Sequence, residues 1–125
     1  SGVGKAILAG LEPEEVHAVL RRHGLPRLTE RTIDTPRRLE AALAEIRGRG
    51  WALDDEEHAI GLRCVAAAIR DEHGGPLGAV SVSGPSVRIP DTRLVELAAA
   101  VRRTARELTR AVGGEEPGST DPQTG

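Results

Sequence analysis

Apolar residues in the first half of the chain recur at the spacing of helices. Residues 1–11 are expected to form a short helix. A second helix is expected to begin at Pro13, because proline and the two acids after it favour a first helical turn, and to end at Gly24. Thr35 is the expected N-cap of a third helix. The apolar stripe of this third helix consists of Leu39, Leu43 and Ile46, and Gly48 and Gly50 end it.

Beyond residue 50 the pattern changes to that of β-strands. Residues 51–53 form a short strand candidate that runs into an acidic turn, and residues 62–69 form a stronger one. Residues 71–76 have the Gly and Pro chemistry of a hairpin connection, and residues 78–83 are the return strand. These strands are therefore expected to pair as an antiparallel sheet.

The longest predicted helix runs from Asp91 to Val112. Its expected stripe consists of Leu94, Leu97, Ala98, Val101, Ala105, Leu108 and Val112. Residues 113–125 are rich in Gly, Glu, Pro, Ser and Thr, so a disordered tail is expected there. Helices, a few antiparallel strands and a closing helix predict an α+β fold, with one domain over residues 1–112.

Composition excludes several classes of function. With 125 residues the chain holds one domain at most. A net charge of −2 and a single aromatic residue, Trp51, argue against nucleic-acid binding by this chain alone. No run of about 18 apolar residues predicts a membrane span, and no signal peptide is expected. One cysteine, Cys64, forms no internal disulfide, which fits the cytoplasm.

Candidate chemistry gathers around the predicted sheet. Residues two apart in a strand share a face, so Ser81 and Ser83 point the same way. With Cys64 and the nearby Asp54 they are expected to line a small polar pocket. The alternatives are a buried Cys64 that acts as a small hydrophobe, and serines on a solvated face. A metal site of Asp54, His58 and Cys64 lacks ligand spacing, and Asp55 to Glu57 are expected to be a solvated turn.

Several motifs in order carry a resemblance to a known family. They are the segment DDEEHAIGLRC from residue 54, SVSGP from residue 81, SGVGKAILA from residue 1, and GLPRLT with RTI from residue 24. This series resembles the effector-binding domain of the IclR family of bacterial transcription regulators, over about residues 1–112. The resemblance implies a GAF-like or profilin-like antiparallel sheet with packed helices.

The resemblance also implies a function and a site. In the family, the positions that match Gly2, Val3, Asp54, Cys64, Ser81 and Ser83 surround a small organic acid or aromatic effector. It further implies upstream strands and a winged helix-turn-helix, which this chain lacks, so the domain is expected to be incomplete at its N-terminal side. DNA would be bound through that missing part alone. No cofactor and no catalytic residue is expected. The protein is expected to form a homo-oligomer, either a dimer or a tetramer.

Two other classes of function stay open at this stage. One is a GAF-like enzyme or redox module that uses Cys64, although no base lies at a telling spacing from the thiol. The other is a plain interaction domain, because a sheet that lacks its upstream strands has an unpaired edge available to a partner. The leading hypothesis is a small-molecule sensing domain.

Overall fold

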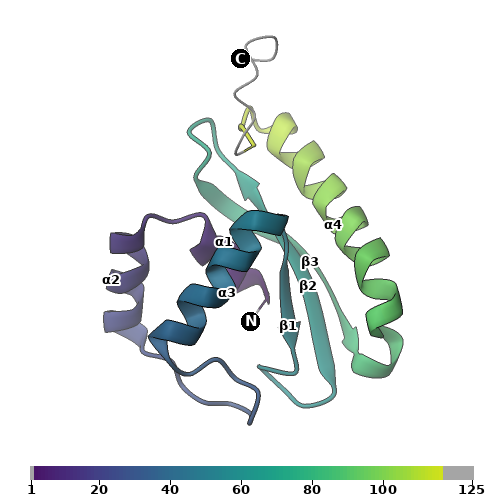
Figure 1. Cartoon of the computed structure of the whole chain (residues 1–125). Helices are drawn as coiled ribbons and strands as arrows, with labels where there is room; N and C mark the ends of the chain where they lie inside the picture. The colour runs from purple at the N-terminus through teal and green to yellow at the C-terminus, as the bar shows by residue number, and fades with distance from the viewer. Residues whose placement is uncertain (1, 117–125) are drawn as a thin grey trace.

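A computed structural model describes residues 2–116 of the chain; residue 1 and residues 117–125 lie outside the described part. In order, the elements are α1 (Gly2–Ala9), α2 (Pro13–His23), α3 (Pro36–Arg49), β1 (Ala52–Asp55), β2 (Leu62–Arg70), β3 (Pro76–Pro85), a 3-10 turn (Ser86–Arg88) and α4 (Asp91–Ala111). The strands form an antiparallel sheet in the order β1-β2-β3 (Figure 1). The predicted α+β fold is confirmed.

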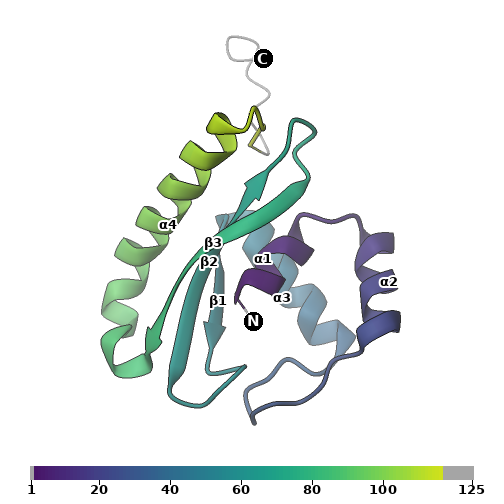
Figure 2. The same ribbon diagram turned by 180° about the vertical axis from the view of Figure 1, so that it is seen from behind.

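Helices cover both faces of this sheet. α4 packs on one face, while α1 and α3 lie on the other (Figures 1 and 2). Alternation along the strands makes both faces apolar. Val65 and Ala67 of β2 pack with Ala98, Val101 and Ala105 of α4. On the other face, Ala52 and Ala66 pack with residues of α1 and α3, namely Ala6, Ala9, Leu39, Leu43 and Ile46.

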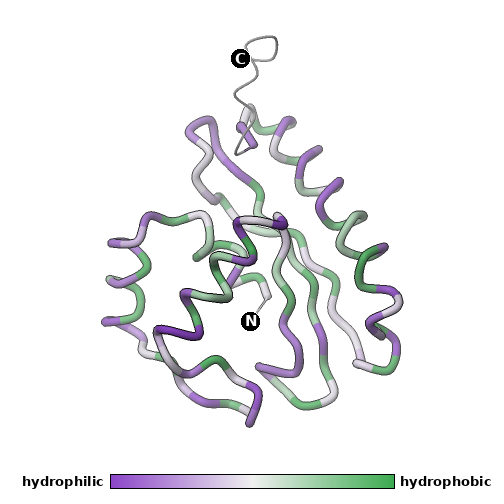
Figure 3. The backbone as a smooth tube through the Cα atoms, in the orientation of Figure 1, coloured by the Kyte–Doolittle hydropathy of each residue, from purple (hydrophilic) through white to green (hydrophobic). Residues whose placement is uncertain are grey.

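Local signals set the helix ends. The Thr35 hydroxyl accepts a hydrogen bond from the backbone N–H of Arg38 at 3.3 Å, which confirms it as the N-cap of α3. Gly50 follows α3 in the left-handed conformation, with φ of 87°, where glycine is favoured. Glu15 accepts from the backbone N–H of Glu12 at 3.1 Å and so caps the start of α2. Hydrophilic positions recur along one side of α2 and α4, as expected for amphipathic helices (Figure 3).

The buried stripe of α4 differs from the predicted one at its end. Leu108 and Val112, expected in the core, are 40% and 57% exposed, and Thr109 is fully buried instead. The reason lies in β2, where the register with β3 shifts between Ile69 and Arg70. The backbone N–H of Arg70 donates to the Thr109 hydroxyl at 3.1 Å. Thr109 is therefore buried despite its hydroxyl, because that hydroxyl provides a hydrogen-bond acceptor for a backbone N–H beside the register shift.

The described residues continue past α4 onto the hairpin. The backbone N–H of Glu115 donates to the carbonyl of Asp71 at 2.9 Å, and that of Gly114 donates to the carbonyl of Thr109 at 2.7 Å. The disordered tail expected over residues 113–125 lies outside the described residues from 117 onward, so it stays a prediction, as does the domain boundary at residue 112.

Candidate functional site: an open cavity at the end of the sheet

One cavity of about 240 Å³ brings the sequence-predicted site residues together. It is lined by all six of them, Gly2, Val3, Asp54, Cys64, Ser81 and Ser83. The start of α1 forms one wall, and the three strands of the sheet form the other. The expected convergence of these residues is therefore observed, while their role in binding stays a prediction.

The register of the sheet explains this convergence. Asp54 of β1 lies opposite Cys64 of β2, which lies opposite Ser83 of β3. These three residues therefore form one row across the sheet. Ser81 lies in the next row, opposite Ala66, and on the same face because strand residues alternate with a period of two. The row presents a carboxylate, a thiol and two hydroxyls toward the helix.

The residues of this row become more exposed from β1 to β3. Asp54 is 4% exposed, Cys64 is half-buried, and Ser81 and Ser83 on β3 are exposed. The cavity thus has a closed end at β1 and an open end at β3.

Asp54 is part of β1, and it orders the turn that follows. Its Oδ1 accepts hydrogen bonds from the backbone N–H groups of Glu57 at 2.9 Å and His58 at 3.4 Å. One carboxylate oxygen is therefore already engaged by the backbone. Of the two expected roles, orienting a neighbour and accepting from a ligand, the first has a visible structural basis.

The acidic residues after Asp54 are not the solvated turn that was expected. Arg31 pairs with Asp55 at 2.9 Å and with Glu56 at 2.7 Å, and Lys5 pairs with Glu57 at 2.8 Å. All three carboxylates belong to half-buried residues. The charge run is instead the point where α1 and the loop before α3 are tied to the sheet.

Arg63 joins this turn to the start of α4. Its Nε donates to Asp55 at 2.9 Å, its Nη1 to the carbonyl of Ile89 at 2.8 Å, and its Nη2 pairs with Asp91 at 2.9 Å. The hydrogen bond from Arg63 lowers the pKa of Asp55, and the same bond raises the pKa of Arg63. This network fixes the end of the sheet from which Asp54 and Cys64 project.

Two threonines before α3 fasten the same turn. The hydroxyl of Thr29 donates to the carbonyl of Glu56 at 2.7 Å, and that of Thr32 donates to the carbonyl of Glu57. These residues belong to the motif that carried the family resemblance, but the sequence alone gave them no role. Threonine hydroxyls satisfy the carbonyls of an irregular segment that has no strand partner.

Three lining residues were not among the predicted six: His58, Leu62 and Arg63. Leu62 was accessible to sequence reasoning, because it is two residues from Cys64 on one strand face. His58 also lines the cavity, and it belongs to the turn whose backbone N–H groups donate to Asp54. Within residues 2–116, no group of three His, Cys, Asp or Glu side chains is placed to hold a metal ion. The polar groups that line the cavity are hydrogen-bond donors and acceptors.

Comparison with known proteins identifies the family that this sequence matches. Residues 1–110 match the family model described as "Bacterial transcriptional regulator IclR C-terminal". The chain is similar to the acetate operon repressor of Salmonella typhimurium, with 51% identity over 114 residues, which are 91% of this chain and 42% of that protein. The chain therefore spans less than half the length of this relative.

Solved structures show the same fold. The crystal structure of the Thermotoga maritima IclR is similar with a TM-score of 0.86 and 35% identity, covering 90% of this chain and 46% of that chain. The inducer-binding domain of the PobR transcription factor from Acinetobacter, a double mutant in complex with 3-hydroxybenzoic acid, has a TM-score of 0.81 and 26% identity. That match covers 90% of this chain and 65% of the PobR chain. Among the described residues of the present chain, no helix combines the length and hydrophobicity that crossing a bilayer requires.

Proposed function

We propose, since the chain belongs to the IclR family of bacterial transcription regulators, that its cavity between α1 and the sheet binds a small organic acid as effector. The observation that carries the proposal is the joint lining of one cavity by Gly2, Val3, Asp54, Cys64, Ser81 and Ser83. The relatives are named as transcription regulators, so the chain belongs to a family of regulators and not of enzymes.

The donors around the cavity suit a carboxylate. The backbone N–H groups at the start of α1, at Gly2 and Val3, have no partner earlier in the helix, and the helix dipole favours negative charge there. The hydroxyls of Ser81 and Ser83 supply further donors at the open end. An acid of a few carbon atoms, or a small aromatic acid, fits a cavity of about 240 Å³.

The ligand bound to a related domain supports a small organic acid as the class of effector. The PobR inducer-binding domain holds 3-hydroxybenzoic acid, which combines a carboxylate with a hydroxyl on a small ring. In the present cavity, the carboxylate would meet the N–H groups of α1 and the hydroxyl would meet Ser81 or Ser83. The family resemblance and the donor set thus favour one chemistry.

The whole protein would act on DNA through a part that this chain does not contain. The relatives are more than twice as long as the matched region, and one of them is a repressor of an operon. We propose that a winged helix-turn-helix outside this chain binds the operator, in the cytoplasm and as a homo-oligomer. Effector binding would then bias the DNA-binding state, which requires different affinities for the two states.

Titration calorimetry with a panel of two- to four-carbon carboxylic acids and hydroxybenzoates tests the proposal. A hit should lose about tenfold to hundredfold in affinity in Ser83→Ala, because a hydrogen bond to a charged ligand contributes roughly 1.5–3 kcal/mol. Thr104→Ala, on an exposed position of α4, is the matched control and should bind as the wild type does. Equal affinity in Ser83→Ala and Thr104→Ala would remove Ser83 from the site.

Thiol labelling separates this function from the alternatives. Bound effector should slow the reaction of Cys64 with a maleimide, since the thiol lines the same cavity. A redox or enzymatic role would require rapid labelling near neutral pH, the mark of a thiolate. A plain interaction domain would show neither acid binding nor protection of Cys64 by any member of the panel.

A further inference from the structure

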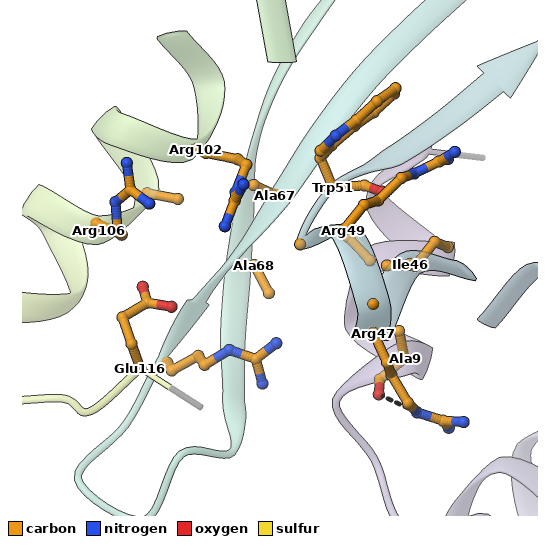
Figure 4. Close-up of a pocket in the computed structure, with 15 residues that line it drawn as sticks. Ala9, Ile46, Arg47, Arg49, Trp51, Ala67, Ala68, Arg102, Arg106 and Glu116 are labelled. Carbon is orange, nitrogen blue, oxygen red and sulfur yellow. Dashed lines mark hydrogen bonds between the residues drawn. The ribbon is translucent and has the colours of Figure 1, made fainter. Parts of the chain in front are cut away.

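A second cavity, of about 210 Å³, lies between the end of α3, β2 and α4. Figure 4 shows Arg102 and Arg106 of α4 on one side, Arg49 and Trp51 on the other, and Ala67 and Ala68 of β2 between them. This cavity shares no lining residue with the cavity between α1 and the sheet, which is called the effector cavity below. It is a separate feature of the fold.

The lining of this second cavity is strongly basic. Five arginines contribute to it, Arg47, Arg49, Arg70, Arg102 and Arg106, against one acid, Glu116. Five positive charges and one negative charge leave four in excess, in a chain whose net charge is −2. Cationic groups gathered against the overall balance of a chain generate a local potential that attracts anions.

Small residues keep the cavity open. Ala67 and Ala105 at its base are 3% and 2% exposed, and neither reaches far from its backbone. A Cβ at Gly50 would lie 2.8 Å from Nε of Arg102, so a larger residue there would displace the guanidinium. The guanidinium of Arg102 therefore lies directly against Gly50, and the small neighbouring residues leave the adjoining space unfilled.

The five arginines fall into two groups. Arg47 donates to the carbonyl of Ala9 at 2.8 Å, and Arg49 donates to the carbonyl of Trp51 at 2.8 Å while stacking 4.0 Å above its ring. Figure 4 shows both guanidinium groups turned away from the cavity. Within residues 2–116, by contrast, no acidic group lies within 4.0 Å of the guanidinium of Arg102 or Arg106.

Arg70 and Glu116 lie at the other end of this cavity, and Nη1 of Arg70 donates to the carbonyl of Gly74 at 3.0 Å. Arg70 is half-buried, and this burial lowers its pKa, while the charge of Glu116 acts in the opposite direction. Oε1 of Glu116 is buried without a hydrogen-bond partner among the described residues. Among the described residues, Arg102 and Arg106 thus have no acidic partner, Arg70 has a single carbonyl acceptor, and Oε1 of Glu116 has no donor.

We propose that this second cavity binds a small doubly charged oxyanion between Arg102, Arg106 and Arg70, and that Glu116 competes with it. A guanidinium group can bind two oxygens of a phosphate or carboxylate at once, through two parallel N–H donors. A single carbonyl oxygen occupies only part of this bidentate donor set. A cavity of about 210 Å³ has room for an ion or a small phosphorylated or dicarboxylic metabolite. Inorganic phosphate is the simplest probe of that shared chemistry.

Calorimetric titration of the full chain with phosphate at pH 7.5 tests the site, with ionic strength held constant by chloride. Wild type should show saturable binding, and Arg102→Gln with Arg106→Gln should weaken it at least about tenfold. Arg103→Gln is the matched control, since Arg103 is exposed on the same helix and does not line the cavity. Glu116→Gln should tighten binding, because it removes the competing charge.

Several outcomes would overturn the proposal. They are no saturable binding by wild type, an equal loss in Arg103→Gln, or weaker binding in Glu116→Gln. Saturable binding of an acidic peptide or of duplex DNA in the absence of any phosphate binding would likewise assign the arginines to another partner. If the double variant fails to fold, Arg106→Gln alone takes its place, since its side chain is exposed. Ser83→Ala should leave phosphate binding unchanged, which separates this site from the effector cavity.

Discussion

Gly2 and Cys64 touch so closely that no side chain fits between them. A Cβ placed on Gly2 would lie 2.8 Å from the sulfur of Cys64 and 3.4 Å from its carbonyl oxygen. At this point the backbone of α1 therefore packs directly against a side chain of the central strand, β2. This contact sets the width of the effector cavity at its middle, since both residues line it.

Gly2→Ala should disturb both folding and effector binding. The added methyl group forces the thiol or the helix to move, and overpacking of this kind typically costs roughly 1–3 kcal/mol. Urea denaturation measures the loss of stability, and calorimetry measures the loss of affinity. Cys64→Ala in the same chain should recover most of the stability, because it removes the sulfur that the methyl group meets.

Gly48→Ala is the matched control for Gly2→Ala. Nothing lies within 4 Å of a Cβ at Gly48, and the residue is inside α3. Alanine should therefore stabilise the helix there by about 0.5–1 kcal/mol. A Gly2→Ala variant as stable as Gly48→Ala would show that the close contact with Cys64 is absent in solution.

The ion pair between Lys5 and Glu57 should be worth more than an ordinary surface pair. The two side chains are 10% and 13% exposed, their charged atoms are 2.8 Å apart, and Lys5 also donates to the carbonyl of Leu53. Lys5→Met should cost roughly 2–4 kcal/mol, because it leaves Glu57 charged, half-buried and without its cation.

A double-mutant cycle isolates that pair. Lys5→Met combined with Glu57→Gln should cost clearly less than the sum of the single variants, since neither leaves the other's charge unpaired. Glu45→Gln, at an exposed position of α3, should change stability by less than about 0.5 kcal/mol. Additive single effects in the cycle would mean that the two charges do not interact.

Stability should fall in acid partly through Asp55. The hydrogen bond from Arg63 lowers the pKa of this carboxyl in the folded state below its ordinary value. The folded chain therefore favours the charged form more than the unfolded chain does. The contribution is fully present above the unfolded pKa and is lost as the pH falls through the folded one.

Asp55→Asn should flatten this acid dependence. We expect a loss of roughly 1–2 kcal/mol near neutral pH, with the gap to wild type narrowing as the pH falls below about 4. Denaturation curves across that range provide the measurement. Asp71, whose pKa is lowered by backbone N–H groups of Gly75 and His73, continues to titrate in the variant, so some dependence should remain. A gap that stays constant with pH would contradict the role of Arg63.

Thr109→Val should destabilise the domain although it increases apolar burial. The hydroxyl accepts the backbone N–H of Arg70, and without it that N–H would be left unsatisfied, at a cost of about 1–3 kcal/mol. Thr104→Val, the same change at an exposed position of α4, should be within about 0.5 kcal/mol of wild type. Thermal unfolding of the two variants compares them directly, and equal midpoints would remove the role assigned to the hydroxyl.

Local rules predicted much of the effector cavity. The period of two in a strand was enough to place Ser81 and Ser83 on one face, and the hairpin fixed which residues of the neighbouring strand lie opposite them. Thr35 and Gly50 likewise mark the ends of α3 through backbone chemistry that depends on near neighbours. The family resemblance supplied Gly2 and Val3, which no local pattern connects to the sheet.

Contacts between distant segments could not be predicted in the same way. The run Asp55 to Glu57 looks solvated until Lys5, Arg31 and Arg63 are brought to it from three other elements. Thr109 looks misplaced in an apolar stripe until Arg70 presents its N–H. Arg102 and Arg106 lie outside the apolar stripe predicted for α4, yet they line a cavity because α3 ends beside them.

The helix α1 lies against both cavities, with Gly2 and Val3 at one and Ala6 and Ala9 at the other. Its eight residues span only about 12 Å at the usual rise of a helix. So short a helix has no hinge to absorb a displacement between its ends. The two cavities consequently share α1 as a wall, and we expect a ligand that shifts Gly2 in one of them to shift Ala9 in the other as well.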